Sequence, residues 1–286
     1  MLKILILGGN GMLGHKMTQV LSREFTVHAT VRKSPSYASG NNITFHENID
    51  IKNLKKLLGL VRDISPDYIL NCVGVIKQLK NVDEKNQNFI NSFFPNHLAE
   101  NIPENSKLIH FSTDCVFDGS SGNYFESDKP NATDSYGISK FKGEPESENT
   151  MVLRTSIIGH EIGKSISLVS WFLSQKSDIY GFNKAIFSGF PTVVLASIVN
   201  KIIKESFFKN GLFHLAADPI SKYDLLKMIN NQYHLNKNIT QNNNFVCDRS
   251  LNPTKFKNNI FQYSYSWEDL IKEMYNDYVL YESMYK

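Results

Sequence analysis

A tyrosine and a lysine four residues apart can serve proton transfer to a carbonyl oxygen, because residues at this spacing share one helix face. The spacing occurs in four pairs: Tyr136/Lys140, Tyr180/Lys184, Tyr223/Lys227 and Tyr233/Lys237. The spacing alone is a weak signal in a chain with 13 tyrosines, since such a pair is an ordinary feature of a helix surface. Position along the chain therefore has to decide among the pairs.

The Tyr136/Lys140 pair has a hydroxyl residue placed before it. Thr113 follows an apolar run at residues 108–111 that is predicted to be a buried strand. Ligands of parallel α/β sheets bind at the carboxyl ends of the strands. A hydroxyl there and a tyrosine on the following helix can converge on one carbonyl oxygen. We therefore favour Tyr136/Lys140 as the reactive pair, because the other three pairs fall beyond the nucleotide-binding half and have no such partner.

Three glycines at regular spacing form the second chemical signal. Gly8, Gly11 and Gly14 follow an apolar run at residues 2–7 and open a segment with helical periodicity. A tight glycine turn lets backbone N–H groups and a helix N-terminus approach a pyrophosphate closely. The alternative is a glycine-rich turn without a ligand. The strand before the glycines and the helix after them favour a nucleotide site.

The end of the second predicted strand indicates which dinucleotide would bind. A carboxylate at this place selects NAD by binding the ribose 2′-hydroxyl. Residues 29–33 contain no carboxylate and end in Arg32 and Lys33. An arginine is suited to a 2′-phosphate, so NADPH is favoured over NADH, with NADH kept as the alternative cofactor. The opposing interpretation is a pair of solvated loop cations.

Strands and helices alternate along the first two thirds of the chain, which predicts a parallel sheet covered on both faces. Strands are expected at residues 2–7, 26–31, 43–45, 68–73, 108–111, 151–154 and 211–215. Helices are expected at residues 13–21, 54–61, 83–99, 193–203 and 267–278. The asparagine-rich segment 237–244 is expected to be a loop. The predicted fold class is α/β, a Rossmann-type doubly wound parallel sheet with a smaller C-terminal α/β substrate domain.

Composition excludes several classes of protein. The 286 residues are 41% hydrophobic and 21% charged, with a net charge of +3, which is too small to indicate nucleic-acid binding. No apolar run approaches the ~20 residues of a membrane helix, so no membrane partner is expected. Cys72, Cys115 and Cys247 form neither a disulfide framework nor a metal pair, which favours a reducing cytoplasm. We expect no metal, and we interpret the histidines at 110, 160 and 214 as core or surface residues.

An ordered set of motifs carries a family resemblance over residues 1–195. Its pieces are Gly8-Gly9-Asn10-Gly11-Met12-Leu13-Gly14, Asn71-Cys72-Val73-Gly74, Asn91, Ser112-Thr113-Asp114, Tyr124-Phe125-Glu126, Tyr136-Gly137-Ile138-Ser139-Lys140, Gly143-Glu144, Leu153-Arg154-Thr155-Ser156 and Gly189-Phe190-Pro191-Thr192. The set resembles the extended short-chain dehydrogenases/reductases, and among them the dTDP-4-dehydrorhamnose reductase family of nucleotide-sugar 4-ketoreductases. The resemblance implies an NADP-binding Rossmann domain at residues 1–158, to which residues 186–216 return. It implies a mainly substrate-binding domain at residues 159–286.

The resemblance assigns roles to individual positions of this chain. The catalytic residues would be Thr113, Tyr136 and Lys140. The cofactor site would comprise Gly8, Asn10, Gly11, Met12, Leu13, Gly14, Arg32, Lys33, Asp50, Ile51, Val73, Gly74 and Asn91, together with Tyr136 and Lys140. The substrate site would include Asp114, Cys115, Ser156 and Arg249. The implied partner is a nucleotide-diphosphate sugar, and the resemblance is compatible with a homodimer.

Three departures from the family pattern fall around the expected sugar pocket. Cys115 stands where the family has a tyrosine, Ile186-Phe187 replaces a frequent Asp-Gln, and residues 157–161 lack the aromatic Trp-Val-Tyr-Gly sequence. These changes leave open whether the sugar is dTDP-4-dehydrorhamnose-like or a UDP-linked amino sugar. The implied activity is NADPH-dependent reduction of the 4-keto group of a nucleotide-linked 6-deoxyhexose, supplying a cell-surface polysaccharide precursor.

Two other classes of function are weighed at this point: another enzyme of the same superfamily, and a non-catalytic subunit. An epimerase of the same superfamily would have to recycle a tightly held NAD. A 4,6-dehydratase needs an acid after Ser-Thr-Asp, and Cys115 cannot serve as that acid. A non-catalytic NADP-binding regulatory subunit would keep the fold without the chemistry, but it would have no physical reason to keep Thr113, Tyr136 and Lys140.

Overall fold

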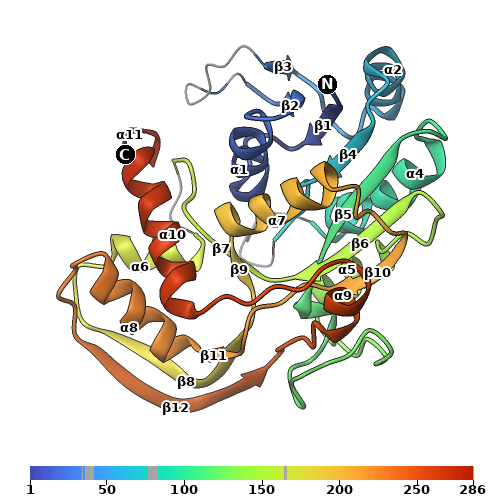
Figure 1. Cartoon of the computed structure of the whole chain (residues 1–286). Coiled ribbons are helices and arrows are strands. Elements are labelled where there is room, and N and C mark those ends of the chain that lie inside the picture. Colours follow the sequence, from blue (N-terminus) through green and yellow to red (C-terminus); the bar gives the residue numbers. More distant parts are fainter. Residues whose placement is uncertain (34, 36–41, 77–82, 164–165, 286) are drawn as a thin grey trace.

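A parallel seven-stranded sheet forms the centre of the protein (Figure 1). The computed structural model describes residues 1–33, 35, 42–76, 83–163 and 166–285. The strand order is β10-β6-β5-β4-β1-β2-β3, and every neighbouring pair is parallel. The strands are β1 (Lys3–Leu7), β2 (Thr26–Val31), β3 (Ile43–Glu47), β4 (Tyr68–Asn71), β5 (Lys107–Thr113), β6 (Thr150–Thr155) and β10 (Gly211–His214). The predicted fold class is confirmed.

The first strand shows why the sheet is buried on both faces. Its residues 4–7 are all fully buried, as the continuous apolar run predicts. Ile4 and Ile6 belong to one hydrophobic cluster, whereas Leu5 and Leu7 belong to a second one. Alternate side chains of one strand therefore enter two separate layers. Each fully buried side chain of this size contributes about 1.5–3 kcal/mol to folding.

Helices cover the two faces of this sheet. On one face, α1 (Met12–Leu21) packs beside α7 (Thr192–Lys204) (Figure 1). On the other face lie α2 (Leu54–Ile64) and α4 (Phe94–Asn101), which share their hydrophobic cluster with Leu5 and Leu7. Strands β1 to β3 are added toward one edge of the sheet and β4 to β6 toward the other, so the strand order reverses between β1 and β4 while all strands stay parallel. In doubly wound folds this point of reversal is the ligand site.

The helix expected at residues 83–99 contains an irregular turn. Its parts are α3 (Glu84–Asn88), the π-helical segment η1 (Phe89–Phe93) and α4. A π turn inserts one extra residue into a helix and often occurs at functional sites. Asn91 lies in this segment with its side chain 99% buried. Helical periodicity gives no sign of such an insertion, because the flanking turns are regular.

A second, smaller group of strands and helices follows β6 (Figure 1). Its three-stranded sheet has the order β11-β8-β12, and β7 and β9 form a separate two-stranded pair. The strands are β7 (Ile157–Ile158), β8 (Ile179–Phe187), β9 (Phe190–Pro191), β11 (Ile220–Ser221) and β12 (Ile239–Asp248). The helices are α6 (Leu168–Ser174), α8 (Lys222–Gln232), α9 (Thr254–Asn259), α10 (Trp267–Leu280) and α11 (Glu282–Tyr285). Between these parts, α7 and β10 bring the chain back to the large sheet.

Two expectations for this second region are wrong. The segment 237–244, expected to be a loop, contains the start of β12, which pairs in parallel with β8. Most β12 side chains are exposed or half-buried, so an edge strand can carry asparagines that sequence patterns assign to loops. The Tyr180/Lys184 pair lies on β8 and not on a helix. A strand places residues four apart on the same face as well.

Among the described residues, no helix is both long and apolar enough to cross a bilayer. Within the same ranges, no group of three or more histidine, cysteine or carboxylate side chains is arranged to hold a metal ion.

Candidate active site

The glycine loop joins β1 to α1 in a tight turn. Gly8 has φ +85°, which is strained for any side chain, and its N–H donates to Thr30 Oγ1 at 3.1 Å. The N–H of Gly11 donates back to Gly8 O at 2.9 Å. A Cβ on Gly14 would lie 2.1 Å from Gly8 O. Glycine is therefore required at 8 and 14 by close backbone approach, whatever the loop binds.

The N-terminus of α1 is suited to an anion. Gly11 is the N-cap and supplies no side-chain hydrogen bond, and the first turn contains no acidic residue. The first N–H groups of a helix, here those of Met12, Leu13 and Gly14, have no intrahelical acceptor. Such N–H groups and the helix dipole together bind phosphate. The loop thus fits the pyrophosphate of a dinucleotide.

The predicted ribose-binding cations lie where the sequence places them, after β2. Arg32 and Lys33 are both exposed, and Asn10 Nδ2 in the glycine loop donates to Lys33 O at 3.0 Å. Asn10 therefore ties the glycine loop to the end of β2. Beyond β3, Asp50 is exposed and accepts the N–H of Lys52 at 2.9 Å, whereas the neighbouring residue Ile51 is buried.

The loop after β4 lies against the glycine loop. A Cβ on Gly8 would lie 3.0 Å from Val73 Cγ2, which places Val73 beside the glycine turn. Asn91 holds this loop from the π segment, because its Oδ1 accepts the N–H of Val75 at 2.9 Å and its Nδ2 donates to Val75 O at 3.0 Å. A Cβ on Gly74 would lie 3.8 Å from Asn91 Oδ1, which is ordinary contact distance. Asn91 thus shapes the wall at Val73 and Gly74.

The hydroxyl groups of Thr113 and Tyr136 meet at the carboxyl end of β5. Thr113 ends that strand, and Tyr136 lies in the first turn of α5 (Ser135–Lys142). Burial raises the pKa of Tyr136 well above its usual value of 10, nearby Cys115 raises it further, and the hydrogen bond with Thr113 lowers it. Thr113 Oγ1 also donates to Asp114 Oδ1 at 3.0 Å. The sequence-predicted donor and its partner hydroxyl are therefore together.

Lys140 lies one turn after Tyr136 and is 5% exposed. Its Nζ donates to Phe111 O on β5 at 2.8 Å. Burial lowers the pKa of Lys140 to about 8, and the coulombic effect of Glu144 opposes that shift.

Helix α5 is fastened to the π segment through Ser139, a residue to which the sequence assigned no role. Ser139 Oγ donates to Tyr136 O at 2.8 Å, and Asn91 Nδ2 donates to Ser139 Oγ at 3.2 Å. Ser92 Oγ donates to Ser139 O at 2.8 Å. A Cβ on Gly143 would lie 1.7 Å from Asn91 O, so the end of the helix also touches this segment. These contacts fix where Tyr136 and Lys140 point.

A buried ionic network supports β5 from behind. Arg154 is 2% exposed and forms a two-pronged ion pair with Glu144, with distances of 2.8 Å for Nε–Oε1 and 2.7 Å for Nη2–Oε2. Ser112, next to Thr113, donates to Glu144 Oε1 at 2.5 Å. On the far side, Arg154 Nη1 contacts His214 Nε2 at 3.2 Å. Glu144 and Arg154 appear in the motif set, but nothing in their spacing indicates that they pair.

The expected substrate residues gather beside Thr113. Asp114 is 7% exposed, and burial raises its pKa. Arg249 reaches this place from the second half of the chain, where its Nε donates to Phe117 O at 2.8 Å and its Nη1 lies 3.6 Å from Cys115 Sγ. Burial raises the pKa of Cys115 to about 12, so its thiol is not activated as a nucleophile. Ser156 accepts the N–H of Phe190 through its carbonyl at 2.9 Å.

The other tyrosine–lysine pairs have no such setting. Tyr223 and Lys227 lie on α8, and Tyr233 ends that helix with its hydroxyl 3.1 Å from His160 Nε2. Lys237 Nζ donates to carbonyls at the end of α6, including Phe172 O at 2.7 Å. Neither contact involves the carboxyl edge of the large sheet.

Comparisons with known proteins identify the family of this chain. Residues 2–279 match the family described as RmlD substrate binding domain. The chain is 30% identical over 243 residues to dTDP-4-dehydrorhamnose reductase of Aggregatibacter actinomycetemcomitans, covering 78% of this chain and 76% of that protein. It is 24% identical over 249 residues to methionine adenosyltransferase 2 subunit beta of Xenopus tropicalis, covering 78% and 70%.

A solved structure shows the same fold. The dTDP-4-dehydrorhamnose reductase of Bacillus anthracis, crystallised in complex with NADP, superposes with a TM-score of 0.79 at 22% identity, covering 96% of this chain and 98% of that one. The chain belongs to the RmlD substrate-binding domain family and is a dTDP-4-dehydrorhamnose reductase-like member of the extended short-chain dehydrogenases/reductases.

Proposed function

We propose that the protein reduces the 4-keto group of a nucleotide-linked 6-deoxyhexose with NADPH and so supplies a cell-surface polysaccharide precursor. Its family makes it an NAD(P)-dependent oxidoreductase that acts on nucleotide sugars. The observation that carries the proposal is the meeting of the Thr113 and Tyr136 hydroxyl groups at the end of β5, on the edge that the glycine loop also occupies.

The glycine loop and its neighbours would hold the dinucleotide. The N–H groups of Met12, Leu13 and Gly14 would bind its pyrophosphate, and Arg32 and Lys33 would bind the 2′-phosphate. Val73, Gly74 and Asn91 would form the wall of the channel that leads to Lys140. A bound nicotinamide would supply hydride to the keto carbon. NADH remains usable, because the exposed cations add affinity for a phosphate without excluding a hydroxyl.

Tyr136 and Thr113 would act on the keto oxygen. As that oxygen gains negative charge, the Tyr136 hydroxyl donates its proton, and the Thr113 hydroxyl turns from Asp114 Oδ1 to donate a hydrogen bond to the same oxygen. The raised pKa of Tyr136 keeps its hydroxyl protonated at neutral pH, so the acid is present in the correct form. Lys140 would bind the nicotinamide ribose, and its ammonium stabilises the tyrosinate left after proton transfer.

The sugar nucleotide would enter from the second region of the chain. Asp114, Cys115 and Ser156 would line the sugar site, and Arg249 would bind the diphosphate. Cys115 is smaller than tyrosine and leaves more room beside the sugar, which is compatible with a UDP-linked amino sugar as well as with dTDP-4-dehydrorhamnose. We propose accordingly that residues 1–158 and 186–216 form the cofactor-binding domain and that residues 159–286 mainly form the substrate-binding domain.

Turnover against a small panel of substrates tests the proposal. NADPH consumption is measured with dTDP- and UDP-linked 4-keto sugars, and NMR identifies the configuration of the product at C4. We expect stoichiometric oxidation of NADPH with one class of sugar. Binding of NADPH without turnover of any panel member would instead indicate a non-catalytic subunit. The 24% identity to a protein named as a subunit, methionine adenosyltransferase 2 subunit beta, makes a subunit role the second candidate.

The cofactor assignment has its own experiment. Losing a charge-assisted hydrogen bond to phosphate costs about 1.5–3 kcal/mol, or roughly ten- to a hundredfold in affinity. Arg32→Ala should weaken NADPH binding by that factor and leave NADH binding unchanged. Equal losses for both cofactors would contradict the assignment of Arg32. An NAD that co-purifies and is not released would favour the epimerase.

A further inference from the structure

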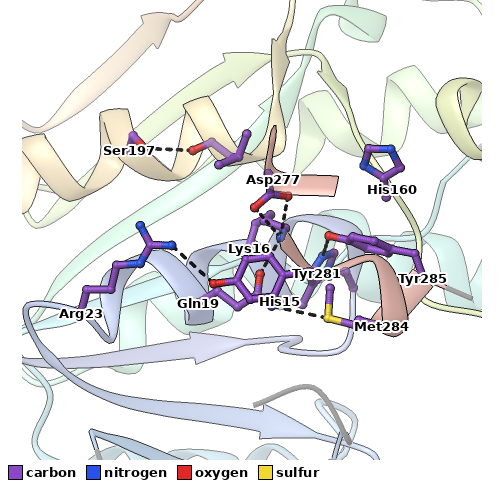
Figure 2. A network of polar contacts seen from close by, with 12 residues as sticks. His15, Lys16, Gln19, Arg23, His160, Ser197, Asp277, Tyr281, Met284 and Tyr285 are labelled. Carbon is purple, nitrogen blue, oxygen red and sulfur yellow. Dashed lines mark hydrogen bonds and ion pairs between the residues drawn. The ribbon is translucent and has the colours of Figure 1, made fainter. Parts of the chain in front are cut away.

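The C-terminal helices lie against α1, the helix that the glycine loop opens (Figure 2). Lys16 on α1 is 1% exposed, and its Nζ lies 2.7 Å from Asp277 Oδ2 on α10. The same Nζ lies 4.6 Å from the centre of the Tyr281 ring. Gln19 Nε2 donates to Met284 Sδ at 3.4 Å. One face of α1 is thus covered by the end of the chain.

One contact in this group reaches the glycine loop itself. His15 Nδ1 lies 2.9 Å from Gly11 O, and His15 Nε2 lies 3.2 Å from the hydroxyl of Tyr285 (Figure 2). A carbonyl oxygen only accepts, so Nδ1 carries the proton and donates to Gly11 O. Burial lowers the pKa of His15 to about 3, which keeps the ring neutral at physiological pH. Nε2 is then an acceptor, and the Tyr285 hydroxyl donates to it.

The Gly11 carbonyl matters because of the peptide group to which it belongs. The C=O of Gly11 and the N–H of Met12 lie in one planar trans peptide and point in opposite directions. Fixing the carbonyl therefore fixes the direction of the Met12 N–H, one of the free donors at the helix N-terminus. The backbone N–H of His15 also donates to Gly11 O at 3.0 Å, so the oxygen is held by two donors.

Tyr285 is itself held in place by residues from other parts of the chain. Its ring centre lies 5.0 Å from that of His160, which follows β7, and 5.9 Å from that of Tyr278 in a stacked arrangement. His160 is 4% exposed and bonds to Tyr233. The position of the Tyr285 hydroxyl is therefore determined by packing as well as by its hydrogen bond.

We infer that Tyr285 is a positioning residue for the dinucleotide: through His15 it orients the Gly11–Met12 peptide and strengthens binding of the pyrophosphate. This inference rests on the proposed function, since it takes the glycine loop as a dinucleotide site. Tyr285 touches neither the reacting atoms nor the sugar site, so its effect is confined to cofactor affinity. By linkage, a bound dinucleotide stabilises the docked C-terminal helices to the same extent.

The test compares two tyrosines of the same segment. Tyr285→Phe removes only the hydroxyl, which bonds to His15 and also lies within hydrogen-bond reach of Asp277. Tyr281→Phe is the matched control, because its ring also faces Lys16 while its hydroxyl lies 3.5 Å from Arg23 and does not contact His15. We expect Tyr285→Phe to raise the Kd for NADPH by about three- to tenfold, as the loss of one hydrogen bond allows. The kcat at saturating NADPH and the KM for the sugar should change little, and Tyr281→Phe should bind NADPH as the wild type does.

An unchanged Kd for Tyr285→Phe would overturn the inference, as would an equal loss in both variants. Should Tyr285→Phe fail to fold, hydrogen exchange of the wild type decides. Saturating NADPH should slow the exchange of amides in residues 277–285, and unchanged exchange there would overturn the inference. A wild-type protein that binds neither NADPH nor NADH would instead refute the proposed function, which separates the two failures.

Discussion

Two tyrosine–lysine pairs of identical spacing, Tyr136/Lys140 and Tyr233/Lys237, have much in common in the folded protein. Burial raises the pKa of both tyrosines, and both lysines donate to backbone carbonyls. The Tyr136 hydroxyl, however, bonds to Thr113 at the carboxyl edge of the parallel sheet, whereas the Tyr233 hydroxyl bonds to His160 among packed aromatic rings. Spacing and burial are therefore shared by the proposed reactive pair and a structural pair, and only the proposed reactive tyrosine has a partner hydroxyl at the sheet edge.

The largest expected difference between the two pairs is the loss of turnover when the Tyr136 hydroxyl is removed. Tyr136→Phe keeps the ring and most of its packing but removes the acid. General acid catalysis contributes about 10²–10⁴-fold, so kcat should fall by that factor. Steady-state turnover of a 4-keto nucleotide sugar is the measurement, with the Kd for NADPH as the control for folding and cofactor binding. Turnover near the wild-type rate would refute the assignment of the acid.

The partner hydroxyl provides the next largest effect. Thr113→Val keeps the shape of the side chain and removes one donor to the developing oxyanion, so kcat should fall by about 10–10²-fold. Thr113 also donates to Asp114, whose pKa burial already raises. Thr113→Ser is the matched control, because it restores the hydroxyl and should recover most of the rate. A valine variant as active as the serine variant would remove Thr113 from the mechanism.

The position of the Tyr136/Lys140 pair at the sheet edge could be predicted from the sequence. Continuous apolar runs fix buried parallel strands, and the residues after them must then lie at one edge of the sheet. Thr113, Tyr136 and the glycine loop follow from that rule. The resemblance to known reductases pointed to the same residues through their order along the chain.

Other features had no signal in a single sequence. The strand β12 carries asparagines on exposed positions of a sheet edge, where backbone pairing and not the side-chain pattern decides the structure. The π turn at Asn91 changes the helix register by one residue without altering composition. Long-range pairs such as Arg154 with Glu144, or His15 with Tyr285, depend on which helices meet in space.

Lys140 and Lys237 differ in burial, and the difference should appear in how the free energy of unfolding depends on pH. The pKa of Lys140 is about 8 in the folded protein against 10.5 for an unperturbed lysine. The unfolded chain therefore binds more protons between these values, so Lys140 destabilises the fold below about pH 8 and this cost disappears as the pH rises toward 10.5. The free energy of unfolding of the wild type minus that of Lys140→Met should rise across this window.

Chemical denaturation of both proteins at several pH values between 7.5 and 9.5 measures the difference. Lys237→Met is the matched comparison, because Lys237 is only partly buried and its substitution should give a much flatter difference. If the free-energy difference for Lys140→Met did not change with pH, the Lys140 ammonium would be as well solvated as the Lys237 ammonium. The two pairs would then have lysines of similar solvation.

The smallest expected effect on turnover is that of Tyr233→Phe, in the pair that we interpret as structural. Tyr233→Phe removes a hydroxyl whose partner is His160 Nε2 at 3.1 Å, far along the chain from Thr113. Losing one buried neutral hydrogen bond should lower the free energy of unfolding by about 1 kcal/mol and leave kcat within a few-fold of the wild type. Thermal unfolding and steady-state turnover on the same preparation measure both quantities. The loss of one hydroxyl among the C-terminal aromatic rings cannot prevent Tyr136 from donating a proton at the distant sheet edge. A folded Tyr233→Phe protein without activity would therefore mean that Tyr233/Lys237, and not Tyr136/Lys140, is the reactive pair.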